Sequence, residues 1–429
     1  MSNKLKTIMK KKSLFPKNYL FVFSFILMVI VSTSCANKVP ALKNGSYQFN
    51  LLREDGKKIV FNAQVTDSLD KKVLYVINGS ERLLADSITF KNDSVYIELP
   101  FFASGFQAKI KDNGDLEGSW IKSYGPRIQT MPFTATYNVT ERFPAGATPA
   151  QDVSGRWSVN FVGKNNDTTL SVGEFVQNGS KLTGTFLLSS GDYRFLEGIV
   201  KGDSLYLSAF DGSHAVLFTA KIDDANHLTG GKLFSGKQGS QTWTAERNAN
   251  ASLPEAASTI KVKPNAGKLN FKFRDMEGKY VSITDDRYKN KVVVIQLLGS
   301  WCPNCLDETR FLAANYKNYN DKGVEFLGIA YERTADFAES QKALSPFVKK
   351  LEIPYPVLIA DVALSDSLRT EKTLPQIETI NAFPTTIFVG KNGEISKIHS
   401  GYDGPATGVH YDMYRKSFDE TINELLNKK

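Results

Sequence analysis

The sequence of 429 residues predicts a multidomain chain in which two homologous antiparallel all-β modules, each a small barrel or sandwich, precede an α/β domain. Three observations support this fold class. Residues 43–248 alternate short apolar-polar runs with Asn-Gly, Ser-Gly and Asp-Gly turns. The same region repeats itself at a constant offset, which carries Gly45 onto Gly155. After residue 268 the pattern changes to apolar strands that alternate with helices.

Residues 1–34 have the composition of a targeting segment. Six lysines and no acidic residue accompany an apolar run at residues 19–31, and three small residues precede Cys35. The run has about 13 residues, whereas a transmembrane helix needs roughly 20. The segment resembles a bacterial lipoprotein signal peptide, which implies that Cys35 is lipidated and becomes the first residue of the mature chain. Ser32 stands where such signals usually have an aliphatic residue, so an ordinary secreted protein and a signal anchor remain alternatives.

Composition and charge exclude several classes of protein. A hydrophobic share of 41% and an aromatic share of 11% argue against a disordered chain, and the lack of a 20-residue apolar span argues against a multi-spanning membrane protein. Loss of residues 1–34 lowers the formal net charge from +8 to +2, because that segment carries six lysines and no acid. We therefore expect no nucleic-acid partner.

The repeat defines β module 1 at residues 41–140 and β module 2 at residues 150–250. Each is long enough for about eight strands. A linker with two prolines separates the modules, and a second linker at residues 251–264 is rich in Ala, Ser and Pro. Matched pairs include Gly45/Gly155, Asn50/Asn160, Asp93/Asp203, Tyr96/Tyr206 and Thr134/Thr244.

The function of the modules is left open by the sequence. The Gly-x-aromatic starts at residues 45–47 and 155–157 weakly resemble lipocalin-type barrels, which enclose small apolar ligands. The alternative is that the large aromatic residues fill the cores of spacer domains. We expect His214 and His227 to lie in surface loops. The aromatic residues in question are Tyr47, Trp120, Trp157 and Trp243.

The third domain, residues 265–429, has the pattern of an α/β fold. Residues 292–298 form a near-continuous apolar run, which is typical of a strand covered on both faces. Helices are predicted at 304–319, 335–350 and 411–427, and further strands at 324–330, 357–359, 386–389 and 395–400.

The sequence Trp301-Cys302-Pro303-Asn304-Cys305 lies between this strand and the first helix. A thiol at a helix N-terminus faces unpaired N–H groups and the positive end of the helix dipole, which favour thiolate. We expect Cys302 to be the exposed nucleophile. Cys305, one turn into the helix and more buried, would resolve a mixed disulfide. Pro303 would fix the backbone without removing a needed donor.

Other uses of a C-x-x-C pair fit less well. Zinc normally needs four ligands, yet there is no second C-x-x-C and the four histidines are scattered, at 214, 227, 399 and 410. Haem attachment needs His at 306, which is Leu. A purely structural disulfide closing so short a loop would add little stability. We therefore predict no metal and no cofactor other than a redox-active disulfide between Cys302 and Cys305.

The motif, followed later in the chain by Phe383-Pro384-Thr385, resembles the thioredoxin superfamily over residues 265–429, and most closely the membrane-tethered TlpA-like thiol:disulfide reductases. The resemblance implies that Pro384 is cis beside the disulfide and that the adjoining backbone pairs with the substrate chain. The substrate-binding residues would then be Trp301, Pro303, Asn304, Phe383, Pro384 and Thr385.

Glu308 matches the acidic residue of TlpA-like proteins that is associated with proton transfer near the buried thiol, and this resemblance implies a catalytic role. The alternative is a solvated first-turn carboxylate, because Asp307 adjoins it and acids favour helix N-termini. Two departures leave the direction of the redox reaction open. Gln296 replaces the buried Asp of many thioredoxins, and Arg310 replaces the proline that often kinks this helix.

The resulting prediction is a periplasm-facing lipoprotein in the cell envelope of a diderm bacterium, in its inner or outer membrane. It would reduce disulfides of envelope proteins, receive electrons from an upstream membrane donor, and contact the membrane through its lipid anchor. One alternative is a peroxiredoxin-like peroxidase, although the P-x-x-x-T/S-x-x-C context fails at both Cys302 and Cys305. The other is a ligand-binding or partner-binding envelope lipoprotein whose β modules carry the main function.

Overall fold

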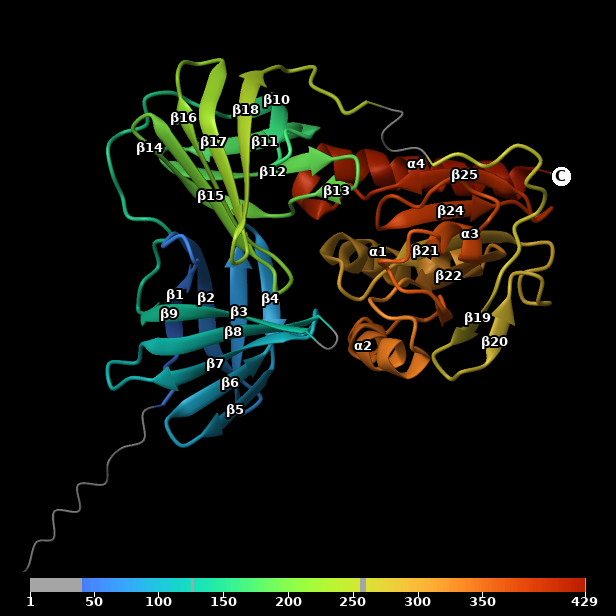
Figure 1. The fold of residues 1–429 in the computed structure, drawn as a ribbon, viewed down its shortest axis with the longest axis horizontal. Coiled ribbons are helices and arrows are strands. Elements are labelled where there is room, and N and C mark those ends of the chain that lie inside the picture. The colour runs from blue at the N-terminus through green and yellow to red at the C-terminus, as the bar shows by residue number, and fades with distance from the viewer. Residues whose placement is uncertain (1–40, 125–126, 255–259, 429) are drawn as a thin grey trace, which may run out of the picture. The chain divides into compact units, whose positions relative to one another are not determined.

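The computed structural model describes residues 41–124, 127–254 and 260–428, which cluster as one unit built on three sheets (Figure 1). The predicted signal peptide and the lipidation site Cys35 lie outside the described residues, as does the centre of the predicted linker 251–264. Within the described part of the chain, no helix is long and apolar enough to cross a bilayer.

β module 1 is an antiparallel sheet of nine strands in the order β4-β3-β2-β1-β9-β8-β7-β6-β5. Its side chains alternate inward and outward, as the sequence pattern predicts. β7, for example, buries Phe106, Ala108 and Ile110 and exposes the residues between them to a greater degree. The strands are β1 Gly45–Leu52, β2 Lys58–Ser68, β3 Lys71–Asn78, β4 Glu81–Ala85, β5 Ser87–Lys91, β6 Ser94–Glu98, β7 Ser104–Ile110, β8 Leu116–Tyr124 and β9 Arg127–Tyr137.

β module 2 is also an antiparallel sheet of nine strands, but it closes on itself. Its order is β11-β10-β18-β17-β16-β15-β14-β12-β13, and β11 also pairs with β12, which completes a barrel. The strands are β10 Gly155–Val162, β11 Thr168–Asn178, β12 Lys181–Leu188, β13 Gly191–Asp192, β14 Leu196–Lys201, β15 Ser204–Phe210, β16 Ala215–Ile222, β17 His227–Ser235 and β18 Gly239–Arg247.

The sequence repeat is also present in the strand register. Gly45 pairs with Val65 between β1 and β2, and Gly155 pairs with Phe175 between β10 and β11. The offset that relates the two glycines also relates their two partners. Each module has nine strands rather than the predicted eight, because a short hairpin strand follows β3 and β12.

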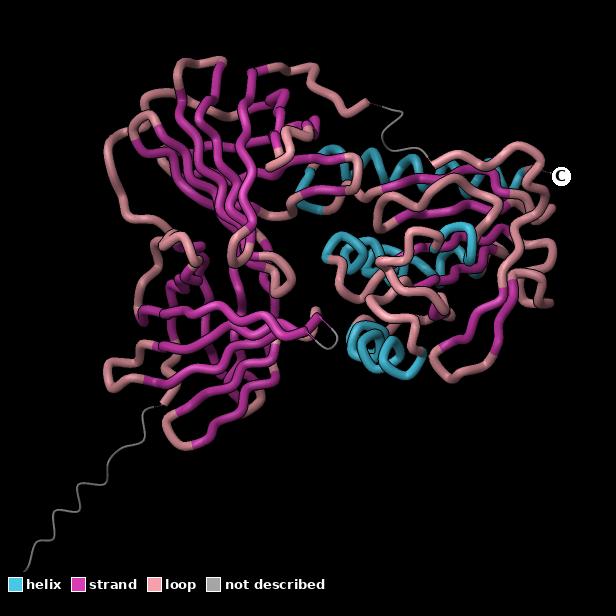
Figure 2. Tube along the Cα trace, in the orientation of Figure 1, coloured by secondary structure: helices cyan, strands magenta, loops and turns pink. Residues whose placement is uncertain are grey.

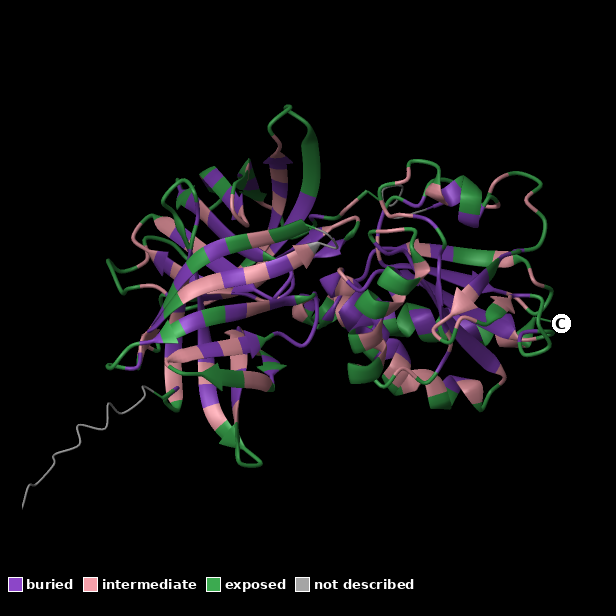
Figure 3. Ribbon diagram, turned by 60° about the horizontal axis from the view of Figure 1, so that its bottom comes forward, coloured by how far each residue is buried: buried purple, intermediate pink, exposed green. Residues whose placement is uncertain are grey.

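Buried hydrophobic residues form a core cluster inside each module. Figure 3 shows buried residues alternating with more exposed ones along the strands. The four aromatic residues singled out in the sequence are at most 2% exposed, which confirms that they are core residues. Stacked and edge-on rings occupy the interior of module 2, where Phe186 and Phe218 lie 4.6 Å apart between ring centroids. These packed interiors do not favour the hypothesis that the modules enclose a small apolar ligand.

The hairpin formed by β15 and β16 reaches from module 2 into the core of module 1. Phe210 stacks on Phe61 with ring centroids 4.3 Å apart. The Asn78 side chain donates to Phe210 O at 2.8 Å and accepts from Phe210 N at 3.2 Å. The Ser104 hydroxyl donates to Gly212 O at 2.7 Å. These contacts fix the tip of the hairpin against module 1.

The α/β domain contains a seven-stranded mixed sheet in the order β20-β19-β23-β22-β21-β24-β25. All residues of β21 are buried, as the apolar run predicts. Phe311 of α1 and Phe418 of α4 share one hydrophobic cluster with Val292 and Val294 of β21. Figure 2 shows the helices of this domain in cyan and its strands in magenta. The elements are β19 Lys272–Asp275, β20 Tyr280–Ser282, β21 Val292–Leu298, α1 Pro303–Asn320, β22 Val324–Ala330, α2 Phe337–Lys350, β23 Val357–Ile359, α3 Arg369–Thr373, β24 Thr385–Val389, β25 Ile395–Ser400, η2 Pro405–Thr407 and α4 Val409–Asn427.

The three predicted helices are present with small differences at their ends, and α3 is an additional short helix. α1 runs through Arg310 without interruption, as expected where no proline kinks it.

Candidate active site

A buried strand turns into a helix at the C-x-x-C motif. β21 ends at Leu298, and Cys302 is the N-terminal capping residue of α1, which begins at Pro303. The Cys305 N–H donates to Cys302 Sγ at 3.1 Å. Proline suits the first helical position, because its ring fixes a helical φ and no intrahelical donor is lost there. Cys302 Sγ therefore lies where backbone N–H groups and the helix dipole stabilise a thiolate.

Cys302 and Cys305 form a disulfide with their Cα atoms 5.2 Å apart. The loop before β24 lies against it. The Phe383–Pro384 peptide bond is cis, as the resemblance implies. Phe383 O lies 3.5 Å from Cys302 Sγ, and the Phe383 ring packs edge-on against Trp301 with centroids 5.6 Å apart. This loop places a backbone carbonyl and an aromatic ring beside the reactive sulfur.

Two residues of the predicted substrate-binding surface, Thr385 and Pro384, form hydrogen bonds within the α/β domain. Thr385 is fully buried, and its hydroxyl donates to Ala382 O at 2.9 Å. Pro384 O accepts from Gly401 N at 2.8 Å. The Thr385 side chain therefore faces the interior of the domain, whereas Phe383 remains half-buried beside the disulfide.

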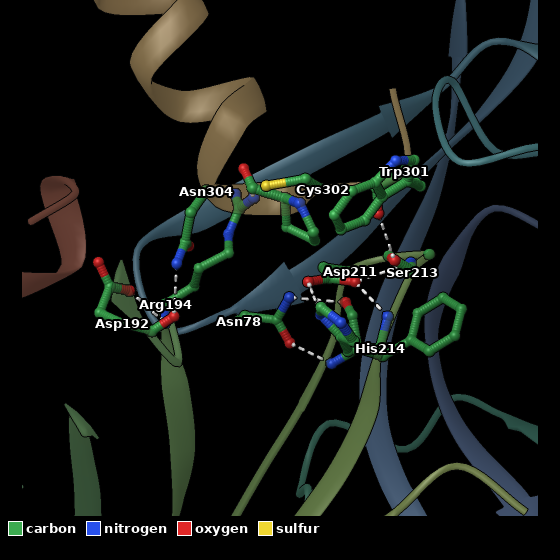
Figure 4. A network of polar contacts seen from close by, with 12 residues as sticks. Asn78, Asp192, Arg194, Asp211, Ser213, His214, Trp301, Cys302 and Asn304 are labelled. Atoms are coloured by element: carbon green, nitrogen blue, oxygen red, sulfur yellow. Dashed lines mark hydrogen bonds and ion pairs between the residues drawn. The ribbon is translucent and has the colours of Figure 1, made fainter. Parts of the chain in front are cut away.

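Two more residues of that surface are bound by β module 2. The Asn304 side-chain amide donates to Asp192 O at 3.1 Å. Pro303 is buried, and its carbonyl accepts from Arg194 Nη1 at 3.1 Å. Figure 4 shows this side of the motif, with Asp192 and Arg194 next to Asn304. The residues of the motif thus face another part of the same chain.

Glu308 is fully buried in α1. Its Oε1 accepts from Thr386 Oγ1 at 2.6 Å and from Tyr414 OH at 2.7 Å, and its Oε2 accepts from Gln296 Nε2 at 2.8 Å. Gln296 Nε2 also lies 3.3 Å from Cys305 O. The alternative of a solvated carboxylate is wrong, because this face of α1 packs on the sheet and on α4.

Burial raises the pKa of Glu308, and the hydrogen bonds from Thr386, Tyr414 and Gln296 oppose that shift. A buried carboxyl with a raised pKa binds a proton more readily than an exposed one, which suits a group that takes up and returns a proton. Thr386 and Tyr414 were not identified from the sequence. Thr386 directly follows the Phe-Pro-Thr sequence, which is the one signal that could have indicated it.

A second buried carboxyl, Asp307, faces β module 2. Asp307 Oδ1 lies 3.3 Å from Arg194 Nη2, and Arg194 also forms an ion pair with Glu81 of module 1. Burial raises the pKa of Asp307 to about 6, although the Arg194 charge lowers it. Burial likewise raises the pKa of Asp192 to about 7. Sequence reasoning missed Arg194, since its partners Pro303 and Glu81 are 109 and 113 residues away.

The prediction that Cys302 is exposed is wrong. Only 5% of the residue is accessible, and it belongs to a hydrophobic cluster that includes Phe210 and Phe234 of module 2. On the side of the motif opposite Arg194, Ser213 Oγ donates to Trp301 O at 3.1 Å (Figure 4). Two loops of β module 2 thus bind the residues on either side of Cys302, and Phe383 O lies beside its sulfur.

The histidines do not gather at this site. His214 lies in an exposed loop, as predicted, whereas His227 is exposed but is the first residue of β17. His399 is half-buried in β25, where desolvation lowers its pKa to about 4, and His410 Nε2 lies 2.7 Å from Glu174 Oε1. In the described residues, no group of three or more His, Cys, Asp or Glu side chains could hold a metal ion.

A buried strand that leads into a helix-capped C-x-x-C disulfide, opposite a cis-proline loop, defines a protein of the thioredoxin superfamily. Residues 261–411 match the family model described as Redoxin. The C-terminal part of the chain is therefore a TlpA-like Redoxin domain.

The curated relatives support this assignment. The thiol-disulfide oxidoreductase ResA of Bacillus subtilis (strain 168) is 26% identical over 132 residues, which cover 31% of this chain and 64% of the relative. ResA of Bacillus thuringiensis subsp. konkukian is 29% identical over 126 residues, which cover 29% of this chain and 63% of the relative. The chain therefore spans less than two thirds of the length of these relatives.

Solved structures with a similar region include a thioredoxin-family thiol:disulfide interchange protein from Chlorobium tepidum TLS. It is 21% identical, with a TM-score of 0.28, and the match covers 39% of this chain and 99% of that one. A DsbF homologue from Corynebacterium diphtheriae is also 21% identical, with a TM-score of 0.29, over 39% of this chain and 97% of that one.

Proposed function

We propose that the protein is a thiol-disulfide oxidoreductase that reduces disulfides of envelope proteins. The observation that carries the proposal is the position of Cys302 Sγ, which caps α1 and lies 3.5 Å from Phe383 O in the cis-proline loop. The N–H of Cys305 and the helix N-terminus stabilise a thiolate at this sulfur. The pair needs no further cofactor, because a dithiol carries both electrons of a disulfide reduction.

The reaction begins with the reduced pair. The Cys302 thiolate attacks one sulfur of the substrate disulfide, so that a Cys302–substrate bond forms, the substrate S–S bond breaks, and the other substrate sulfur leaves as a thiolate. The Cys305 thiolate then attacks Cys302 Sγ and displaces the second substrate thiolate. Two electrons have passed to the substrate, whose thiolates take up two protons, and Cys302–Cys305 is the oxidised product.

Glu308 is the proton acceptor for the second step in this proposal. Cys305 must lose its proton before it attacks, and the buried Glu308, whose pKa is raised by burial, is a stronger proton acceptor than an ordinary carboxylate. Gln296 connects the two, since its side-chain amide contacts both Cys305 O and Glu308 Oε2. The carboxyl would therefore remove the proton inside the domain.

The cellular setting in the proposal comes from the N-terminal sequence. A lipid on Cys35 would hold the chain at the membrane of a diderm envelope, with the Redoxin domain facing the periplasm. Each turnover leaves a disulfide, so an upstream membrane donor would have to return two electrons to Cys302 and Cys305.

The two cysteines are tested by single-turnover reduction of a disulfide with the pre-reduced protein. Cys302→Ser should abolish the reaction, because no nucleophile remains. Cys305→Ser should accumulate a mixed disulfide at Cys302, visible by mass spectrometry, because nothing resolves it. Cys35→Ser is the matched control and should react like the wild type. Full activity in either active-site variant would disprove the mechanism.

The role of Glu308 is tested by the pH dependence of the same reaction. A base with a raised pKa works only when deprotonated, so the wild-type rate of resolution should fall as the pH drops through that pKa. Glu308→Gln should slow resolution by about 10²-fold at neutral pH and remove this dependence. Glu420→Gln, on the exposed face of α4, serves as control. If Glu308→Gln kept the wild-type pH profile, water rather than Glu308 would be the acceptor of the Cys305 proton.

A further inference from the structure

Two segments of β module 2, residues 191–195 and residues 211–214, lie against the C-x-x-C motif and are called the cap below. Together with Phe383 they leave 5% of Cys302 accessible. Thiol-disulfide exchange needs direct access to sulfur, because the attacking, central and leaving sulfurs take part in one step. The position of the cap therefore limits which disulfides can reach Cys302.

The first segment binds the helix side of the motif. Asp192 O accepts from the Asn304 side chain, and Arg194 Nη1 donates to Pro303 O, both at 3.1 Å. The Asp192 carboxylate accepts from Gly404 N at 2.9 Å, which ties the segment to the loop after β25. An added Cβ on Gly401 would lie only 2.7 Å from Ser189 O, so the two backbones are in close contact.

The second segment, the tip of the β15–β16 hairpin, binds the strand side. Ser213 Oγ donates to Trp301 O at 3.1 Å. Lys122 of module 1 donates to Ser213 O at 2.6 Å, and the Ser104 hydroxyl donates to Gly212 O. The tip is therefore supported from behind by module 1, and Figure 4 shows Ser213 directly next to Trp301.

Arg194 connects all three domains. It is 5% exposed and contacts Glu81 of module 1, Asp307 of α1 and Pro303 O. Its backbone has φ of +56°, a left-handed conformation that is uncommon for residues other than glycine. Such a conformation persists where surrounding contacts fix it, and it often marks a functional element.

A small opening adjoins the covered motif. A recess of about 250 Å³ lies beside Trp301, and its lining includes Trp120, Gln129, Ser213 and Arg333. Pockets for drug-sized ligands usually enclose about 300–1,000 Å³. The recess can admit a small molecule next to the motif but not a folded protein.

We infer that the β modules act as a gate that selects substrates by size, and that Arg194 is the specificity-determining residue that holds the cap closed. In the closed chain, small disulfides can react at Cys302, whereas disulfides of folded proteins react only after the cap has moved. The inference rests on the proposed function for its substrate class. It gives the tandem modules a role that packed spacer domains would lack.

The test compares the full chain with Arg194→Met in single-turnover reduction of two probes, insulin and bis(2-hydroxyethyl) disulfide. Arg194→Met removes the ion pairs and the bond to Pro303 O while keeping a long apolar side chain. We expect the rate with insulin to rise at least about fivefold and the rate with the small disulfide to change less than about twofold. Arg247→Met is the control, since Arg247 donates to the carbonyls of Asp152, Ser154 and Ala225 within module 2. An unchanged insulin rate, or equal changes with both probes, would overturn the inference.

A second measurement separates the gate from the proposed function. The reduced proteins are treated with a bulky maleimide-polyethylene glycol and, separately, with iodoacetamide, and modification of Cys302 is followed by mass spectrometry. Faster reaction of the bulky reagent with Arg194→Met supports the gate even if the wild type reduces neither probe, which would refute only the proposed function. Equal rates of bulky modification overturn the gate even if both probes are reduced.

A milder variant covers the case in which Arg194→Met does not fold. Ser213→Ala loses one hydrogen bond to Trp301 O and leaves the buried ion pairs intact. We expect it to raise the rate of bulky modification about twofold and to keep the thermal unfolding temperature of the wild type. No change in modification of this folded variant would contradict the inference.

Discussion

The two β modules have equivalent strands that pair in the same register. They differ after the β3–β4 hairpin of module 1 and the equivalent β12–β13 hairpin of module 2. In module 1, β3 pairs with β4 from Asn78↔Glu81 to Leu74↔Ala85. In module 2 the equivalent pairing begins in the same register, Leu188↔Gly191, and stops one pair later. The chain then leaves the sheet, and β14 pairs with β12 instead.

The departure occurs at the residues that cover the redox motif. Arg194 corresponds to Leu84 by the offset of the repeat, and Leu84 continues a strand with its side chain 39% exposed. Where the strand β13 of module 2 ends earlier than its equivalent β4, the following residues contact the redox motif instead of continuing the sheet. The released segment binds α1, and the pairing of β12 with β14, which has no counterpart in module 1, closes the barrel.

The largest effect should come from the residue that joins the two modules. Phe210→Ala should lower the free energy of unfolding by about 3–5 kcal/mol, because a fully buried ring leaves a cavity in the core of module 1. Urea unfolding measures the loss. Phe218→Ala, equally buried within module 2, is the control.

Hydrogen exchange distinguishes these two variants. Phe210→Ala should speed amide exchange in β2 and β8 of module 1, whereas Phe218→Ala should affect the strands of module 2. The same exchange pattern in both variants would show that the hairpin does not couple the modules.

An intermediate effect is expected from Asp192, which has no acidic counterpart at Arg82 in module 1. Its pKa in the folded chain is raised to about 7 by burial, so the folded state binds this proton more tightly than the unfolded state does. That contribution to stability is fully present below about pH 4 and is lost as the pH rises through about 7.

Asp192→Asn should therefore lose less stability than the wild type between pH 4 and pH 7.5, by on the order of 2 kcal/mol. Urea unfolding at a series of pH values checks this. Asp307 titrates in the same window and remains in the variant, so a residual slope is expected. Parallel stability curves for the two proteins would refute the assignment.

The smallest effect is expected at the module 1 counterpart of Arg194. Leu84→Arg changes an exposed strand residue away from the motif, so stability should change by less than about 0.5 kcal/mol. Modification of Cys302 by the bulky maleimide should match the wild type. A large change in accessibility would mean that module 1 also controls the cap.

Sequence reasoning identified the features that depend on local pattern. The apolar run of β21, the C-x-x-C at the start of α1 and the proline before β24 are each signals carried by a few adjacent residues. The two β modules were predicted from signals of the same kind, namely turn residues and an internal repeat.

The remainder depends on contacts between distant parts of the chain. The sequence around Cys302 does not indicate which loops lie against the motif. Their hydrogen bonds to Trp301 and Asn304 join residues that are 88 and 112 positions apart in the sequence. Tyr414 reaches Glu308 across 106 residues, and neither position has a periodicity that predicts the other. From the sequence, Arg194 is indistinguishable from an exposed charged residue after a turn. Its burial depends on ion pairs with two other domains, which no local pattern indicates.

The covered disulfide also has a consequence for how long the chain keeps its redox state. A sulfur that is 5% accessible meets protein thiols and other bulky redox partners slowly, whatever the equilibrium with them would be. Exchange between the pair and such partners then depends on how often the cap opens as well as on their reduction potentials. Under the proposed gate, the reduced pair would keep its electrons longer in the presence of bulky oxidants than an uncovered dithiol would.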